Sequence, residues 1–173
     1  IKKATYDAIQ SCGFSFPKVV NFVILKVNLR YYWDYSTGET TDPRVVSAVV
    51  DYIRDHYDQD IDIIVAEADA SAMRTKYAFK MLGYEELANK KSLKLMNLCE
   101  CAKVEKRVVV NKKDFILSVA EPMLNANLIV NVPKLRTHRI TNVTCCLKNM
   151  FGSIAEARKI VYHPNLDEVI VGI

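Results

Sequence analysis

The chain has 173 residues, of which half are apolar and a quarter are charged, with only five glycines and five prolines. This length suits one domain, and the composition excludes intrinsic disorder and fibrous repeats. The net charge of +4 comes from lysines and arginines interspersed with acids, which argues against a nucleic-acid partner because such partners need basic residues clustered on one face.

The sequence also argues against a membrane span and a metal-binding cysteine framework. Its longest apolar run is much shorter than the roughly 20 residues that a spanning helix needs, and no signal segment stands at the start. The five cysteines are odd in number and lack the spacing of zinc or ferredoxin-type sites: Cys12, Cys99, Cys101, Cys145 and Cys146. We therefore expect reduced thiols and a cytoplasmic location.

The first part of the chain predicts a strand followed by a helix. Val19–Val27 is a nearly continuous apolar run, typical of a strand buried on both faces. A loop should follow over residues 28–41. Asp42 is then a good N-cap and Pro43 a good first helical residue. The buried stripe of this helix would be Val45, Val46, Val49 and Ile53.

The same alternation continues, which predicts the fold class. Ile61–Ala66 reads as a second strand, and Ser71 as the N-cap of a helix that ends at Leu82 before Gly83. Strand, helix, strand and helix in turn favour an α/β fold with a mostly parallel sheet and flanking helices, in a Rossmann-like three-layer arrangement. We expect residues 1–173 to form a single such domain.

The second half adds strands and two helices. Lys112-Lys113 indicates a turn between two strands, and Leu128–Val132 is another buried strand. We expect Thr141 to cap a helix that runs to Phe151 and ends at Gly152. The remaining expected elements are strands at Ser92–Met96, Val104–Val110 and Phe115–Val119 and a short helix near Glu121–Ala126.

In a protein with an open parallel sheet, the ligand-binding site is expected beyond the carboxyl ends of the strands. Lys26 and Asn28 end the first strand, Glu67 and Asp69 follow the second, and residues 133–138 follow the strand at Leu128–Val132. These groups would meet at one edge if the three strands are neighbours. Glu67 and Asp69 could hold Mg²⁺, but acids also suit a helix N-terminus, and we expect no metal site.

The expected helix from Thr141 offers a second set of polar groups. Val143, Leu147, Met150 and Phe151 would share its core face, which leaves Thr141, Thr144 and Lys148 together on another flank. Two hydroxyls and an ammonium at a helix start could cradle an anion, or could belong to an ordinary capped and solvated helix.

His138 and Lys134 each allow functional interpretations and an ordinary structural one. His138 could transfer a proton near neutral pH, or could simply make hydrogen bonds in a loop. Lys134 could bind a carboxylate or phosphate, or act as a base if burial lowers its pKa, or could be an ordinary surface residue. The loop over residues 28–41 holds four aromatic side chains that either close over a ligand or pack on another part of the protein: Tyr31, Tyr32, Trp33 and Tyr35.

Several common signatures are absent from the sequence. No Gly-x-Gly-x-x-Gly or Walker-type loop follows the first strand, and no Gly-x-Ser-x-Gly elbow is present. A conventional dinucleotide site, a P-loop and an α/β-hydrolase nucleophile are therefore excluded.

Four segments together resemble the prokaryotic family of domain of unknown function 362: Lys26–Leu29, Thr40–Val46, Asn131–His138 and Leu147–Gly152. Val27 stands where that family usually has proline, and Arg136 where it usually has lysine. The family has no agreed reaction, but some members are fused to ferredoxin-like iron–sulfur domains, which implies redox work. It normally continues into a glycine-rich stretch, so we expect this domain to be a fragment, incomplete at its C-terminus, of a longer chain.

These observations lead to two functional hypotheses. The first is an enzyme-like domain that binds a small anionic substrate or cofactor, with His138 and Lys134 as catalytic residues. The second is a non-catalytic module that docks on an iron–sulfur or redox partner through the aromatic loop and the basic edge. Any iron–sulfur cluster would lie in a separate segment or subunit, because the cysteines of this chain do not match such a site. The expected ligand-binding residues are Lys26, Asn28, Thr41, Asp42, Glu67, Arg136, Thr137, Thr141, Thr144, Lys148 and Asn149.

Overall fold

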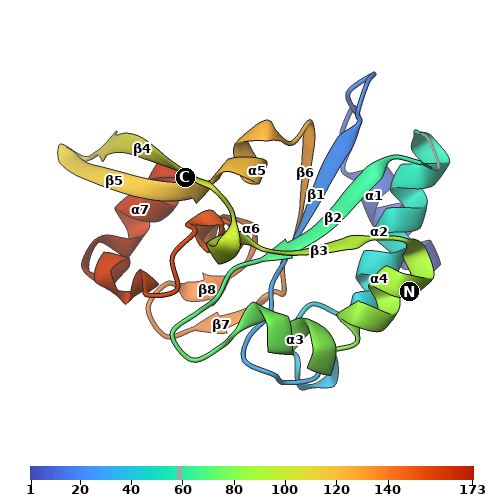
Figure 1. The fold of residues 1–173 in the computed structure, drawn as a ribbon, viewed down its shortest axis with the longest axis horizontal. Coiled ribbons are helices and arrows are strands. Elements are labelled where there is room, and N and C mark those ends of the chain that lie inside the picture. The colour runs from blue at the N-terminus through green and yellow to red at the C-terminus, as the bar shows by residue number, and fades with distance from the viewer. Residues whose placement is uncertain (58–59) are drawn as a thin grey trace.

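A four-stranded parallel sheet lies at the centre of the computed structural model, which describes residues 1–57 and 60–173 (Figure 1). Its strand order is β3-β2-β1-β6, and the strands are β1 (Phe22–Val27), β2 (Asp62–Glu67), β3 (Lys94–Asn97) and β6 (Leu128–Val132). The inner strands β1 and β2 are buried on both faces because most of their residues are apolar. The predicted mixed α/β class with a parallel sheet is confirmed.

Helices cover one face of the sheet: α1 (Lys2–Ser11), α2 (Pro43–His56), α3 (Thr75–Met81) and α4 (Tyr84–Lys91). The α2 helix begins as predicted, since the Asp42 carboxylate accepts the N–H of Arg44 at 2.8 Å and Pro43 is the first helical residue. Its buried side chains pack with alternate residues of β1 and β2 in one apolar core. The sheet is thereby held on this side by an amphipathic helix layer.

The other face has a different cover. It combines the antiparallel hairpin of β4 (Lys103–Val110) and β5 (Lys113–Ala120) with α5 (Glu121–Asn125), α6 (Cys146–Met150) and α7 (Leu166–Gly172). A turn joins the two strands as predicted, but it is formed by Asn111 and Lys112, one residue earlier than expected, with φ values of 50° and 64° that fit a two-residue hairpin loop. Because a hairpin shares this cover with short helices, the Rossmann-like three-layer arrangement stays a prediction.

Two predicted helix starts are wrong. Ser71 does not cap a helix, because α3 begins at Thr75, where the Asp69 carboxylate accepts the Thr75 N–H at 2.8 Å. Thr141 does not cap one either, because the segment forms a short antiparallel hairpin of β7 (Arg136–His138) and β8 (Asn142–Thr144). The β-branched residues of this segment favour strands, and α6 begins only at Cys146.

These corrections change the environments of three groups. Val143 and Leu147 are 50% and 74% exposed, so they do not form the expected core face, although Phe151 is buried. Thr141 and Thr144 lie in the hairpin rather than on a helix flank with Lys148. The β-branched residues Val169, Ile170 and Val171 near the end of the chain are helical, in α7.

Strand order brings the predicted strand ends together. β1 pairs with β2 on one side and with β6 on the other, so Lys26 lies opposite Ala66 and Asn131. The order reverses at β1, and ligands of open α/β sheets bind outside the carboxyl ends of strands at such a reversal. The condition that the three strands are neighbours is therefore met. Within the described ranges, no helix is long and apolar enough to cross a membrane.

Candidate functional site

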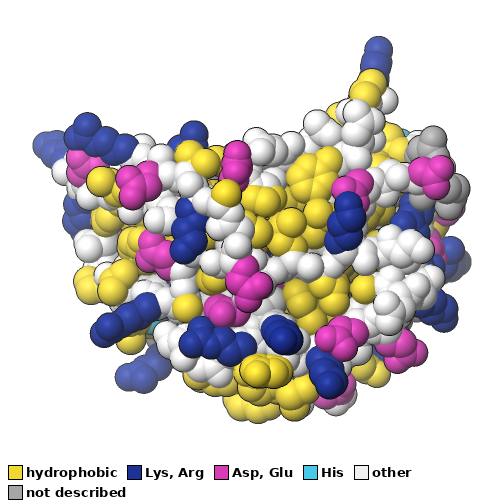
Figure 2. Space-filling view, viewed as in Figure 1, with side chains coloured by type: hydrophobic (Ala, Val, Ile, Leu, Met, Phe, Trp, Pro, Cys, Tyr) yellow, Lys and Arg dark blue, Asp and Glu magenta, His cyan; other side chains and the backbone are white. Residues whose placement is uncertain are grey.

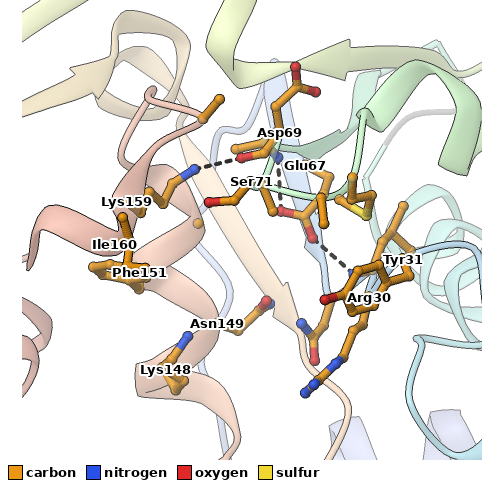
Figure 3. A pocket seen from close by; sticks show the side chains of 18 of the residues that line it. Arg30, Tyr31, Glu67, Asp69, Ser71, Lys148, Asn149, Phe151, Lys159 and Ile160 are labelled. Carbon is orange, nitrogen blue, oxygen red and sulfur yellow. Dashed lines mark hydrogen bonds between the residues drawn. The ribbon is translucent and has the colours of Figure 1, made fainter. Parts of the chain in front are cut away.

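A cavity of about 420 Å³ lies at the carboxyl edge of the sheet (Figure 3). The segments after β1 and β2 form one side, and β7, α6 and residues 157–163 form the other. Six of the residues predicted for the site line it: Asn28, Glu67, Arg136, His138, Lys148 and Asn149. The structure thus brings together about half of the predicted site.

A buried ion pair forms the floor of this cavity. Lys26 is completely buried in β1, and its Nζ lies 2.6 Å from Glu67 Oε1 in β2. The ammonium also donates to the Val27 carbonyl at 2.6 Å and to Asn149 Oδ1 at 3.4 Å, so all three of its protons have acceptors. Glu67 in turn accepts the backbone N–H groups of Leu29 and Ala68. Lys26 is therefore neutralised and does not bind a ligand by free charge.

Gly152 and Asn149 fit closely around this pair. A Cβ at Gly152 would lie 2.8 Å from both Nζ and Cε of Lys26, so a side chain there would displace the buried ammonium. Asn149 is also buried, and its amide donates to Asn131 Oδ1 at 2.8 Å and to the Lys26 carbonyl at 3.3 Å. The predicted helix end at Gly152 thus has a packing role beneath the cavity.

The walls of the cavity are mainly cationic. Four Lys or Arg side chains line it against two Asp or Glu side chains, and both acids pair with cations outside the lining, Glu67 with Lys26 and Asp69 with Arg74. The four lining cations are Arg30, Arg136, Lys148 and Lys159. Glu39, also outside the lining, approaches both Arg30 and Arg136, so the positive charge of the lining is only partly compensated.

Lys148 differs from the other lysines at the site. Its ammonium lies 4.9 Å from the ring centre of Phe151, and it has no hydrogen-bond acceptor or carboxylate partner among residues 1–57 and 60–173. Burial first, and then the charge of Arg136, lower the pKa of Lys148 from 10.5 to about 8. Lys159, by contrast, donates to the backbone carbonyls of Asp69 and Glu156.

His138 has a defined orientation. Its Nδ1 accepts the backbone N–H groups of Ile140 and Thr141 at 3.3 and 3.2 Å, which places the proton of the neutral ring on Nε2. Burial first, and then the charges of Lys148 and Arg136, lower the pKa of His138 from 6.5 to about 4. At neutral pH the ring is therefore uncharged and can donate a hydrogen bond through Nε2.

The other predicted residues lie outside the cavity lining. Thr41 joins the strand ends, since its hydroxyl donates to the Val132 carbonyl at 2.7 Å and accepts the Asn28 N–H at 3.0 Å. Asp42 caps α2 and lies near Lys134, whose backbone N–H donates to Asn28 Oδ1 at 3.4 Å. Thr137 is exposed in β7, on the strand face opposite to Arg136 and His138.

Sequence reasoning missed several lining residues. Arg30 stands next to the predicted strand end, and its guanidinium packs on the rings of Tyr31 and Trp33 at 5.8 and 5.9 Å. Proximity to a strand end could have identified Arg30. Lys159 and His163 come from a 3₁₀ segment, Lys159–Asn165, for which the sequence offers no periodic signal.

The acids of the site are already engaged by the protein. Asp69 accepts the Thr75 N–H, the Asn97 side chain at 3.1 Å and an ion pair from Arg74, so it fixes the start of α3. In the part of the chain that the structure describes, no group of three or more His, Cys, Asp or Glu side chains could hold a metal ion. The site is thus a mainly cationic cavity next to a buried ion pair.

Fold and cavity together define an α/β domain with a cationic site at a strand-order reversal. The family model of Domain of unknown function (DUF362) matches residues 23–173, which is nearly the whole chain, and the protein belongs to this family. No curated protein and no solved structure matches the chain.

Replacing Lys26 alone should destabilise the fold strongly. Lys26→Met leaves Glu67 buried and charged without its partner, so the free energy of unfolding should fall by about 3–5 kcal/mol in urea denaturation. Lys26→Met combined with Glu67→Gln should lose less, because the neutral amide still accepts the Leu29 N–H. Lys134→Met, outside the floor, serves as the control. Equal losses in the single and double variants would contradict the buried pair.

The stability of the protein should depend on the protonation of His138. Its pKa is lowered in the folded state, so between pH 6.5 and 4 the unfolded chain binds more protons and the free energy of unfolding falls as the pH falls. His138→Gln keeps an acceptor for the turn but removes the titration. Its urea-unfolding profile should be flatter over this range. Parallel profiles for the variant and the wild type would show that His138 is not desolvated as described.

Proposed function

We propose that this domain is an enzyme-like unit that binds a small anionic substrate or cofactor in the cavity at the carboxyl edge of the sheet. The observation that carries the proposal is the Lys148 ammonium, which faces the cavity without a carboxylate partner among the described residues. A partly buried charge is unfavourable unless a partner compensates it. An anionic ligand would supply that partner.

Arg136 and Arg30 support the proposal from the opposite walls. Both guanidinium groups approach Glu39 Oε2, at 3.3 and 3.6 Å, so one carboxylate is shared between two cations. Burial first, and then the neighbouring Arg30, lower the pKa of Arg136, as expected for an incompletely compensated charge. A planar guanidinium binds carboxylate or phosphate through two parallel hydrogen bonds. We infer that these arginines orient the ligand and that Lys148 neutralises it.

His138 takes the role of a neutral donor in this proposal. Its Nδ1 is occupied by the two backbone N–H groups of its own turn, so Nε2–H is the atom available to a ligand. A neutral imidazole among cations can donate a hydrogen bond to a ligand oxygen without adding charge. In this proposal Lys134 lies near Asp42, at the edge of the cavity, and takes no part in a reaction.

The chemistry of the whole protein is proposed to be redox-linked, with any iron–sulfur cluster in a separate segment or subunit. The five cysteines here are free thiols. Cys145 and Cys146 are neighbours whose Sγ atoms lie 3.9 Å apart, but neither lines the cavity. The proposal therefore gives this domain the task of holding the anion and leaves electron transfer to another part of the protein.

Docking on an iron–sulfur partner is the second candidate function. Several elements around the cavity expose apolar side chains: Tyr31, Trp33, Leu135, Val143 and Leu147. Figure 2 shows basic and apolar side chains together along the lower margin, where α3 and the segment after β1 lie. Exposed apolar groups beside charges are typical of interaction surfaces. A partner bound there would lie next to the anion in the cavity.

Replacing Lys148 should make the protein more stable and weaken its binding of anions. Lys148→Met removes an unpartnered ammonium, so the variant should be about 1–2 kcal/mol more stable at pH 7, with the gain shrinking above pH 8 as the wild-type amine loses its proton. Its affinity for oxalate, citrate or inorganic phosphate, measured by calorimetry, should fall about tenfold or more. Lys134→Met should change neither quantity. Unchanged affinity in Lys148→Met would overturn the proposed site.

The docking surface has its own test. Trp33→Ser with Leu147→Ser should weaken the binding of a [4Fe–4S] ferredoxin, measured anaerobically by interferometry, by about tenfold while oxalate binding stays intact. Val19→Ser is the matched control, because Val19 is 73% exposed and precedes β1 at the opposite edge of the sheet. Equal binding by the double variant and the control would remove the second candidate.

A further inference from the structure

We propose that Lys148 is a nucleophile that forms an imine with a carboxylate bearing a carbonyl group, such as a 2-oxo acid, held in the cavity. This inference rests on the proposed function and names a substrate class for the same site. It also gives the unpartnered ammonium a covalent role, in which the amine acts through its lone pair and not only through its charge.

The three lysines around the cavity differ in how their amines are used. Lys26 donates to three acceptors beneath the floor, and Lys159 donates to two backbone carbonyls. Both amines are therefore engaged as hydrogen-bond donors, although burial also lowers the pKa of Lys159. Lys148 has no such acceptor among the described residues, and it lies against the face of Phe151. It is the lysine whose lone pair the protein leaves available.

The surroundings of Lys148 favour its neutral form. Its side chain is partly buried beside an aromatic ring, and Arg136 and Lys26 contribute positive charge. Desolvation and neighbouring cations are the two conditions that activate lysine as a nucleophile. The lowered pKa of about 8 agrees with this geometry: at pH 8 about half of the Lys148 amine is neutral, against roughly one in 250 for an unperturbed lysine.

Two arginines of the cavity favour a substrate that carries a carboxylate. Arg136 and Arg30 can hold a carboxylate, and a carbonyl carbon attached to that carboxylate would then lie in the cavity that Lys148 lines. Competing thiols are absent from the lining, since none of the cysteines among the described residues contributes to it. The cavity volume of about 420 Å³ accommodates a small acid of this kind.

The step balances without an oxidant or a metal. The lone pair of Nζ attacks the carbonyl carbon, a C–N bond forms, and the carbonyl π electrons move to oxygen, which takes up a proton. Loss of this hydroxyl as water breaks the C–O bond and leaves an imine. The His138 ring lines the same cavity and can donate a hydrogen bond from Nε2 to this oxygen, while the protons that the oxygen takes up come from Nζ and from water. The protonated imine can then accept electrons from a breaking C–H bond at the neighbouring carbon C3, as in proton exchange.

Reductive trapping tests the inference. Purified protein is incubated at pH 8 with pyruvate, glyoxylate or 2-oxoglutarate and sodium cyanoborohydride, and the modified lysines are mapped by mass spectrometry. At least one acid should modify Lys148 about tenfold faster than the exposed Lys112 in the same sample. Excess oxalate, which has no ketone, should slow this modification. Modification of Lys148 no faster than Lys112 with all three acids would overturn the inference.

Two further arms separate this inference from the proposed function. Lys148→Arg keeps the positive charge and removes the nucleophile, so trapping should be lost at acid concentrations that calorimetry shows to saturate the variant. Oxalate binding without trapping in the wild type would refute the imine and leave the anion site standing. Absence of both would refute the two together. Trapping of propionaldehyde at the rate of the acids would refute selection by the carboxylate.

Discussion

The structure depends on the buried ion pair between Lys26 and Glu67. It joins the central strand β1 to β2 at their carboxyl ends, where the sheet would otherwise expose unsatisfied backbone groups. The pair is tolerable only because every proton of the ammonium and both carboxylate oxygens have hydrogen-bond partners. Close packing by Gly152 and Asn149 excludes water from it, and this fixes α6 over the sheet.

That arrangement creates two kinds of cation at one edge. Lys26 is matched by an acid of the protein, whereas Lys148, only four residues before Gly152, faces the cavity without one among the residues that the structure describes. Because Gly152 holds α6 against the pair, the position of Lys148 follows from the same packing that neutralises Lys26. The two lysines are thus close to one another but electrostatically distinct.

Sequence predicted the parts of the fold that periodicity and capping determine. The β1, β2 and β6 strands, the Asp42-Pro43 start of α2 and the turn before Lys113 follow from local pattern. The strand ends then identified Glu67, Arg136 and His138 as neighbours in space. Distinguishing Lys26 from Lys148 was beyond the sequence, because only the tertiary structure shows which lysine has a carboxylate within reach.

The wrong helix start at Thr141 has a physical cause that also positions part of the site. Helical spacing in residues 141–151 competes with β-branched residues that pair across a hairpin, and the hairpin prevails because His138 Nδ1 accepts the N–H groups of its turn. The strand period then turns Arg136 and His138 to one face, toward the cavity, and Thr137 to the other. The hairpin therefore places the side chains of Arg136 and His138 on the same side of the cavity as Lys148 of α6.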